Sequence, residues 1–273
     1  MAGYIGSKSS VTLVDGYTEA EADAEFVNDP SSVITVSGSN VGIGETVPLG
    51  RLHVKTADSG ATVDVGADEF VIEGSGNAGM SILSGASNTG SIYFGDSGTN
   101  WDGYIAYSQN SRSMTFGTAA GGGSMTLDSS GRVTAPSQPA FLVRPSGYQL
   151  NIQNLATTLV AFGNETFDRG NNFSNSIYTA PVTGVYQFNF GLRIQSVDTA
   201  ATYYQTTLNT SNSYFEHLFS PKLTSDMQYW TVQVSVLADM DAGDTAKVEI
   251  LQAFGDGAMD IHSASHFSGY LVA

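Results

Sequence analysis

The strongest constraint on the fold is a run of alternating residues that begins at Gly184. Every second position of the run is apolar: Tyr186, Phe188, Phe190 and Leu192. Gln187, Asn189 and Arg193 fall on the other face. Side chains alternate between the two faces of a β-strand, so this strand has one apolar face that a second sheet must cover. The run therefore predicts a strand inside a domain of two packed sheets.

Further strands are expected throughout the C-terminal half. They cover residues 140–143, 159–162, 176–179, 184–194, 202–208, 213–219, 228–238, 246–254 and 264–272. Gly, Pro, Asn and Asp separate these segments, and helix signals are missing. The segment 228–238 has large apolar or aromatic side chains on both faces, with Trp230 on one face and Tyr229 on the other. A strand of this kind is expected to lie against a covering element or a partner subunit, in an all-β sandwich.

The segment from residue 162 to residue 190 resembles the signature of the C1q family. The residues that carry the resemblance are Phe162, Asp168, Phe173 and Tyr178, followed by Gly184, Tyr186, Phe188 and Phe190. The likeness continues in residues 243–248, and residues 265–272 fit the last strand of the family. The gap before Tyr178 is shorter than usual in the family. The resemblance implies a C1q/TNF-like jelly-roll β-sandwich that assembles as a homotrimer.

Changes in composition and in the spacing of apolar residues divide the chain into three predicted regions. These are residues 1–30, 31–134 and 139–273. Between 31 and 134, apolar residues recur at two-residue spacing in runs too short to bury a core of their own. Such strands are expected to share a core with other copies, as a β-rich interwound trimeric shaft without exposed edges. Residues 135–139 contain two prolines and form a short stiff linker to the C-terminal head.

The first thirty residues are expected to form an attachment segment. A capping box at residues 18–21 predicts a short acidic helix over 19–26, which needs a docking partner because it is too short to be stable alone. The start of the chain resembles the virion-attachment end of fibres from tailed bacteriophages of marine bacteria. The resemblance implies that other virion proteins contact Tyr4, Ile5, Glu19, Glu21 and Phe26. A solvated acidic tail is the alternative.

Residues 40–54 resemble a recurrent phage-fibre segment. Asn-Val-Gly-Ile-Gly at 40–44 is followed by Pro48 and by Leu-His-Val at 52–54, as in that segment. Together with the C1q-like end, this resemblance implies a homotrimeric virion fibre with an anchor, a shaft and a distal head.

Charge and composition exclude several classes of partner. The chain has a net charge of −16 and only ten Lys and Arg residues, so we expect no binding to nucleic acid or to anionic membrane surfaces. It contains no long apolar run and no basic, apolar leader, so neither membrane insertion nor an ordinary secretion signal is expected. Cysteine is absent, which excludes disulfides and thiol nucleophiles.

No pattern indicates an enzyme. His262 and His266 have a spacing that suits metal binding on a helix, but on a strand they would lie about 13 Å apart. No Gly-x-Ser-x-Gly elbow is present, and no Lys follows the glycines at 121–123. No catalytic residue, cofactor site or metal site is therefore assigned.

The predicted loops near 195–201, 221–227 and 255–262 would share the distal end of a jelly roll with the family topology. They carry the candidate receptor-binding residues Asp198, Lys222, Asp226, Asp256 and Asp260. Oxygen-rich clusters can hold Ca²⁺, the one cofactor considered, whereas ordinary solvated turn aspartates are the alternative.

These features predict a phage tail fibre, a virion protein that is extracellular after release and whose distal head binds a glycan or protein on the host surface. Three alternatives stay open at this point. They are a purely structural or capsid-attached decoration fibre, a cell-encoded C1q-like lectin or ligand, and a glycan depolymerase that uses paired carboxylates.

Overall fold

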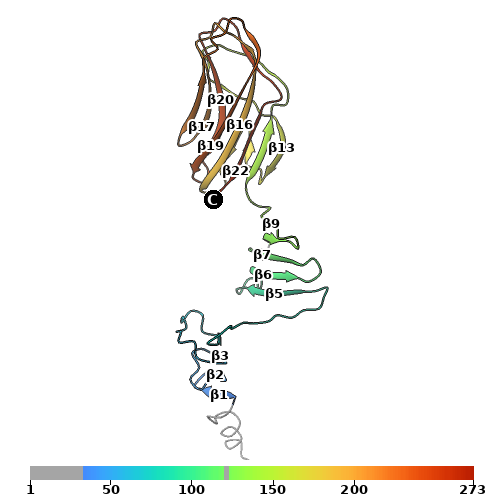
Figure 1. Ribbon diagram of the computed structural model, residues 1–273, viewed down its shortest axis with the longest axis vertical. Helices are drawn as coiled ribbons and strands as arrows, with labels where there is room; N and C mark the ends of the chain where they lie inside the picture. Colours follow the sequence, from blue (N-terminus) through green and yellow to red (C-terminus); the bar gives the residue numbers. More distant parts are fainter. Residues whose placement is uncertain (1–32, 120–122) are drawn as a thin grey trace, which may run out of the picture. The chain divides into compact units, whose positions relative to one another are not determined.

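The computed structural model describes residues 33–119 and 123–273 (Figure 1). These residues form strands, turns and bends but no helix, so the prediction of an all-β protein is confirmed. No helix in this part of the chain has the length and apolar character needed to cross a membrane. The expected helix at 19–26 and the attachment residues Tyr4, Ile5, Glu19, Glu21 and Phe26 lie outside the described residues.

The chain divides into two compact units, Met1–Ser84 and Gly85–Ala273. This division falls inside the predicted shaft, and the predicted domain boundaries stay predictions. The first unit contains a four-stranded sheet, which we call the N-terminal sheet. Its strands, in spatial order, are β1 (Ile34–Ser37), β2 (Asn40–Ile43), β3 (Leu52–Lys55) and β4 (Phe70–Glu73). The first pair is antiparallel and the other two pairs are parallel.

The second unit begins with a meander of antiparallel strands, which we call the five-stranded sheet. Its strands lie in chain order: β5 (Thr89–Phe94), β6 (Gly103–Ser108), β7 (Ser113–Gly117), β8 (Gly123–Leu127) and β9 (Val133–Thr134). Each pairs only with its neighbours in the chain, as short connections between antiparallel strands allow.

The rest of the second unit is a sandwich of two sheets, which we call the head. The first sheet is built around β16 (Gly184–Val197), which pairs over nearly its whole length with β19 (Met227–Met240). On its other side lie β21 (Met259–Ile261) and β22 (His266–Leu271), which together make one interrupted strand. The sheet is completed by β10 (Ala140–Arg144), β11 (Gln149–Ile152) and β13 (Asn164–Arg169). Figure 1 labels β13, β16, β19 and β22.

The second sheet of the head has β20 (Thr245–Ala253) at its centre. Around it lie β12 (Thr158–Leu159), β14 (Phe173–Ser174), β15 (Ile177–Thr179), β17 (Tyr203–Thr210) and β18 (Tyr214–Phe219). The two sheets share one apolar core, which runs from Phe141 to Phe267 in the sequence.

Aromatic rings from both sheets meet in this core. Phe141 of the first sheet stacks on Tyr178 of the second, with ring centroids 4.7 Å apart. Phe188 lies 5.7 Å from Tyr178 in an edge-on arrangement. Such pairs add to the free energy gained by burying the rings. The four apolar residues that define the alternating run are all at most 2% exposed, so the predicted face of that strand is confirmed.

Several strands of the head differ from the sequence-based expectation. The strand expected at 159–162 is shortened to Thr158–Leu159, and β16 and β19 extend beyond their predicted ends. No strand was predicted at the positions of β11 and β13. Both lie at edges of their sheet. β13 reads Asn-Glu-Thr-Phe-Asp-Arg and lacks the apolar alternation that identifies a half-buried strand. β11 reads Gln-Leu-Asn-Ile, whose alternation extends over only four residues and was missed.

Candidate binding site at the loop end of the head

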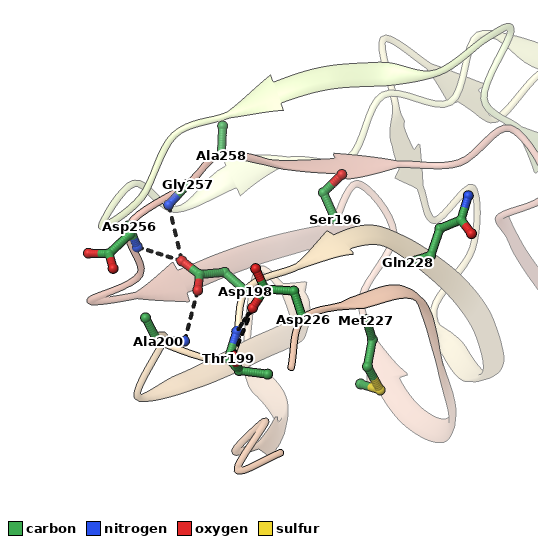
Figure 2. Close-up of a pocket in the computed structure, with 10 residues that line it drawn as sticks. All are labelled: Ser196, Asp198, Thr199, Ala200, Asp226, Met227, Gln228, Asp256, Gly257 and Ala258. Carbon is green, nitrogen blue, oxygen red and sulfur yellow. Dashed lines mark hydrogen bonds between the residues drawn. The ribbon is translucent and has the colours of Figure 1, made fainter. Parts of the chain in front are cut away.

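Three loops meet at one end of the head and enclose an open pocket of about 690 Å³, which we call the loop pocket. They follow β16, precede β19 and follow β20. Figure 2 labels the ten residues that line the pocket. Asp198, Asp226 and Asp256 are among them, one from each loop. The structure thus brings three of the five predicted receptor-binding residues together, and their role in receptor binding stays a prediction.

The carboxylate of Asp198 is already engaged by backbone groups. Its Oδ1 accepts the N–H of Ala200 at 2.8 Å. Its Oδ2 accepts the N–H groups of Asp256 and of Gly257, the latter at 3.0 Å. Figure 2 shows these three bonds converging on one side chain. Asp198 thus fixes the loop after β20 against the loop after β16.

Asp226 makes a similar connection to the same loop. Its Oδ1 accepts the backbone N–H of Thr199 at 2.9 Å and the Thr199 hydroxyl at 2.7 Å. These two bonds hold the pKa of the Asp226 carboxyl below its ordinary value. Asp226 therefore stays ionised while it ties the loop before β19 to the loop after β16.

A buried tyrosine holds the backbone of Asp198 in place. The backbone N–H of Asp198 donates to the Tyr204 hydroxyl at 2.8 Å, and the Tyr204 side chain is fully buried. Burial raises the pKa of Tyr204 to about 12, so the hydroxyl keeps its proton at neutral pH.

The groups left for a ligand differ from those that hold the loops. Among the described residues, no hydrogen bond or ion pair engages the Asp256 carboxylate, and Asp256 is exposed. The Ser196 hydroxyl and the Gln228 amide also line the pocket, and no lining residue carries a positive charge. Carboxylates, a hydroxyl and an amide suit ligands rich in hydroxyl groups, or cations. Binding of Ca²⁺ at this pocket stays a prediction.

The other two predicted receptor-binding residues lie outside this pocket. The Asp260 side chain accepts the backbone N–H of Asn151 at 2.8 Å and so joins β21 to β11. Lys222 lies in the loop before β19 but does not line the pocket.

The exposed position of Phe254 was not predicted from the sequence. Phe254 was expected to be the last residue of a buried strand. The strand stops at Ala253, and Phe254 adopts a left-handed backbone conformation with φ 59°. Its side chain is 65% exposed and directly precedes Gly255, whose N–H and C=O both bond the Asn154 side chain. A bulky residue at positive φ is uncommon and marks a constrained loop. An aromatic residue next to Gly-Asp-Gly was the only signal in the sequence.

His262 belongs to an aromatic group on the first sheet. Its Nε2 lies 2.9 Å from the Tyr148 hydroxyl, and its Nδ1 accepts the N–H of Ala264 at 2.9 Å. The Arg193 guanidinium lies 4.1 Å from the centre of the Tyr229 ring, which meets His262 edge-on. Burial and, after it, Arg193 lower the pKa of His262. Both ring nitrogens therefore have protein partners, as a structural role requires.

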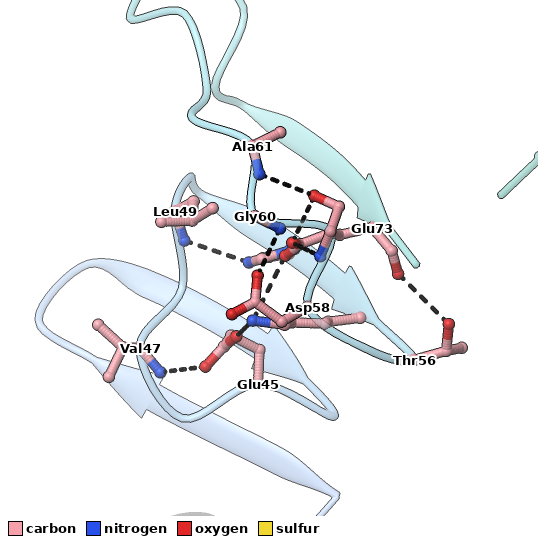
Figure 3. Close-up of polar contacts among 11 residues, drawn as sticks. Glu45, Val47, Leu49, Thr56, Asp58, Gly60, Ala61 and Glu73 are labelled. Atoms are coloured by element: carbon pink, nitrogen blue, oxygen red, sulfur yellow. Dashed lines mark hydrogen bonds and ion pairs between the residues drawn. The ribbon is translucent and has the colours of Figure 1, made fainter. Parts of the chain in front are cut away.

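The N-terminal sheet holds the described group most similar to a metal site. Ligand atoms of Glu45, His53 and Glu73 all lie within 4.8 Å of one another. His53 Nδ1 accepts the N–H of Leu49 at 3.2 Å, which places the ring proton on Nε2, 3.0 Å from Glu73 Oε2. Figure 3 shows the surrounding polar contacts.

A cation is already present in this group. The Lys55 ammonium pairs with Glu45 and lies 3.5 Å from Glu73 Oε2. The Ser59 N–H and hydroxyl bond the other oxygen of Glu73 at 2.7 and 2.8 Å. A metal ion would have to displace Lys55, so we interpret the group as a polar network that holds the loops over one face of the sheet.

Comparisons with known proteins identify one domain family in the chain. The family model of the C1q domain matches residues 140–272. The globular domain of zebrafish complement 1qA protein is 17% identical, and the match covers 50% of this chain and 98% of that chain with a TM-score of 0.39. Murine APRIL, in a crystal structure at pH 8.0, is 11% identical, with 50% and 99% covered and a TM-score of 0.38. No curated protein matches the chain.

The family match covers the same residues as the two-sheet head. C1q/TNF-like domains commonly form trimers, and they are typically binding modules rather than enzymes. The C-terminal half of this chain therefore has the C1q/TNF-like jelly-roll fold.

Proposed function

We propose that this chain is a bacteriophage tail fibre whose C-terminal head binds a glycan or protein on the host cell surface. Three copies form the fibre, and residues 1–30 attach it to other virion proteins. The fibre belongs to the virion and is extracellular after release. The head is an adhesin with no catalytic role.

The observation that carries the proposal is the loop pocket. Rigid sheets bring three separate loops of the head to one place, and the carboxylate of the exposed Asp256 there has no hydrogen-bond or ion-pair partner among the described residues. Loops held by a rigid scaffold commonly carry recognition, because they can vary while the fold is kept. Three copies of such a pocket would bind a repeating surface polymer with avidity.

The N-terminal part of the chain supports a fibre rather than a free-standing lectin. Before the head, the described residues form two small sheets of short strands, and neither sheet encloses a core of its own. The resemblance of residues 40–54 to a phage-fibre segment adds to this argument.

An adsorption experiment tests the proposal. Purified full-length protein should compete with virions for susceptible cells, and antibodies against it should label virion tails in electron micrographs. Asp256→Ala should compete less well. Glu165→Ala, which removes one negative charge from exposed strand β13, should compete like the parent protein. If the parent protein neither competes nor labels tails, the proposed function is wrong.

A second candidate is a structural or decoration fibre without receptor specificity. The engagement of Asp198 and Asp226 in bonds within the loops favours it, since both aspartates then have a structural reason to be present. Under this alternative, virion particles are labelled but the purified protein does not compete for cells.

A further inference from the structure

The N-terminal sheet has one face that is apolar at every position. Its cross-strand register forms two rows. One row is Ile34, Ile43, Val54 and Ile72, and the other is Val36, Val41, Leu52 and Phe70. The opposite face carries His53 and Glu73, which are buried under the chain's own loops. The polar face is thus covered, whereas Phe70 on the apolar face is 50% exposed.

The five-stranded sheet repeats this arrangement. Residues that share one face across the register are Ile92, Phe94, Ile105, Tyr107, Met114, Phe116, Met125, Leu127 and Val133. None of these residues is charged, and none is buried. Phe94 is 58% exposed and Val133 is 63% exposed. The opposite face is rich in Ser and Thr and carries an aromatic group around Tyr104.

A single sheet that leaves such a face in water would be unstable. Side chains of these sizes leave roughly 500 Å² of apolar surface on each sheet, which is as large as the largest patch on a typical monomer. The two sheets together expose about 1,000 Å² per chain, which is close to one partner's share of a standard protein interface.

We propose that both apolar faces are interfaces between copies of this chain, each packed around a common threefold axis as a triangular prism of three sheets. This inference rests on the trimer in the proposed function and names the surfaces that build it. The occupant of each apolar face is thus the same face of the other two copies.

The dimensions of the five-stranded sheet fit this arrangement. Five strands spaced about 4.8 Å apart are about 19 Å wide, and strands of five or six residues have a similar length. If three faces of this width close into a triangle, the centre of each face lies about 5.5 Å from the threefold axis. Packed sheets lie roughly 10 Å apart, so each sheet normally lies about 5 Å from the middle of the core between them, which is a similar distance. Three sheets of this size therefore enclose a core that their own side chains can fill.

Connectivity also favours other copies as the occupant. The net charge of −16 on each chain opposes association, and these uncharged faces are where that repulsion is weakest. The linker at 135–139 spans at most about 17 Å, so a trimer of heads would hold three five-stranded sheets close together at high effective concentration.

The chain contains no cysteine, so single-cysteine variants of the full-length protein provide a clean test. Met125→Cys places a thiol on the apolar face of β8, and Thr126→Cys places one on the opposite face of the same strand. On β1 of the N-terminal sheet the matched pair is Val36→Cys, on the apolar face, and Ser37→Cys, at an exposed position on the opposite face. Leu127→Cys replaces Met125→Cys if that variant does not fold.

Each variant is measured in three ways: light scattering for mass, mild oxidation followed by a non-reducing denaturing gel, and the rate of maleimide labelling. We expect three times the chain mass throughout. Apolar-face thiols should form disulfide-linked pairs of chains and be labelled severalfold more slowly than their controls. Opposite-face thiols should stay unlinked.

Other outcomes separate the two proposals. A trimer whose apolar-face thiols are labelled as fast as the controls overturns the prism but leaves the trimer intact. Slow labelling without cross-links shows that another part of the same chain covers the face, which also overturns the prism. A monomeric mass contradicts the trimer of the proposed function and, with it, this inference.

Discussion

The carboxylate of Asp198 accepts a hydrogen bond from the backbone N–H of Gly257, 59 residues further along the chain, at 3.0 Å. The same oxygen accepts the N–H of Asp256, so one side chain joins two loops of the head. The shape of the loop pocket therefore depends on Asp198, whereas its free carboxylate belongs to Asp256. Sequence alone treats these acidic residues alike, and the structure separates their roles.

The first prediction follows from this division. Asp198→Ala leaves three backbone N–H groups without their acceptor, and it should lower the free energy of unfolding by about 1–3 kcal/mol. Asp256→Ala removes no hydrogen bond made by a side chain and should leave the stability unchanged. Chemical denaturation of both full-length variants measures the difference. Equal stabilities would show that the Asp198 bonds do not hold the loops.

The second prediction concerns a glycine beneath the aromatic core. A Cβ at Gly269 would lie 2.6 Å from the Phe188 ring and 2.8 Å from the Phe141 ring. Gly269→Ala should therefore overpack the core and lower the melting temperature, at a cost of about 1–3 kcal/mol. The control is Ser268→Ala, on the opposite face of the same strand, which should have a smaller effect. A neutral Gly269→Ala would mean that the core can shift to accept a methyl group.

Sequence predicted the parts of the fold in which local pattern and burial agree. The alternation from Tyr186 to Leu192 identifies a strand because one face of β16 is buried. Edge strand β13 has only Phe167 as an aromatic or aliphatic residue, so no period is visible there.

Contacts within the candidate sites could likewise not be predicted from local sequence patterns. Loop order placed Asp198 and Asp226 near each other, but their backbone partners depend on exact loop conformations. The pairing of His53 with Glu73 depends on the parallel register of β3 and β4, which no local pattern encodes.

The third prediction is a dependence of stability on pH in the N-terminal sheet. Bonds from the Ser59 N–H and hydroxyl, followed by the weaker effect of Lys55, lower the pKa of Glu73 from 4.5 to about 2. A carboxyl whose pKa is lower in the folded state stabilises the fold fully above its unfolded value, and this contribution is lost as the pH falls through the folded value. The sheet should therefore lose stability between about pH 4.5 and about pH 2.

Hydrogen exchange of the β3 and β4 amides across this pH range measures the effect in the full-length chain. Glu73→Gln keeps the shape of the side chain but cannot titrate, so its amides should be less protected at neutral pH and should change less with pH. If the parent protein and Glu73→Gln have the same pH profile, another group controls the acid response.

The last prediction is that residues 139–273 fold without the rest of the chain. All residues of the buried core cluster lie between Phe141 and Phe267, so the two sheets of the head cover each other. A fragment 139–273 should therefore show a β-sheet circular dichroism spectrum and a cooperative thermal transition. The control fragment 145–273 lacks β10, which lies between β22 and β13 and buries Phe141 and Val143 completely or nearly so. Its removal opens the core between two strands, so this fragment should unfold or aggregate. If both fragments melt alike, β10 is dispensable; if neither folds, the head depends on residues before 139.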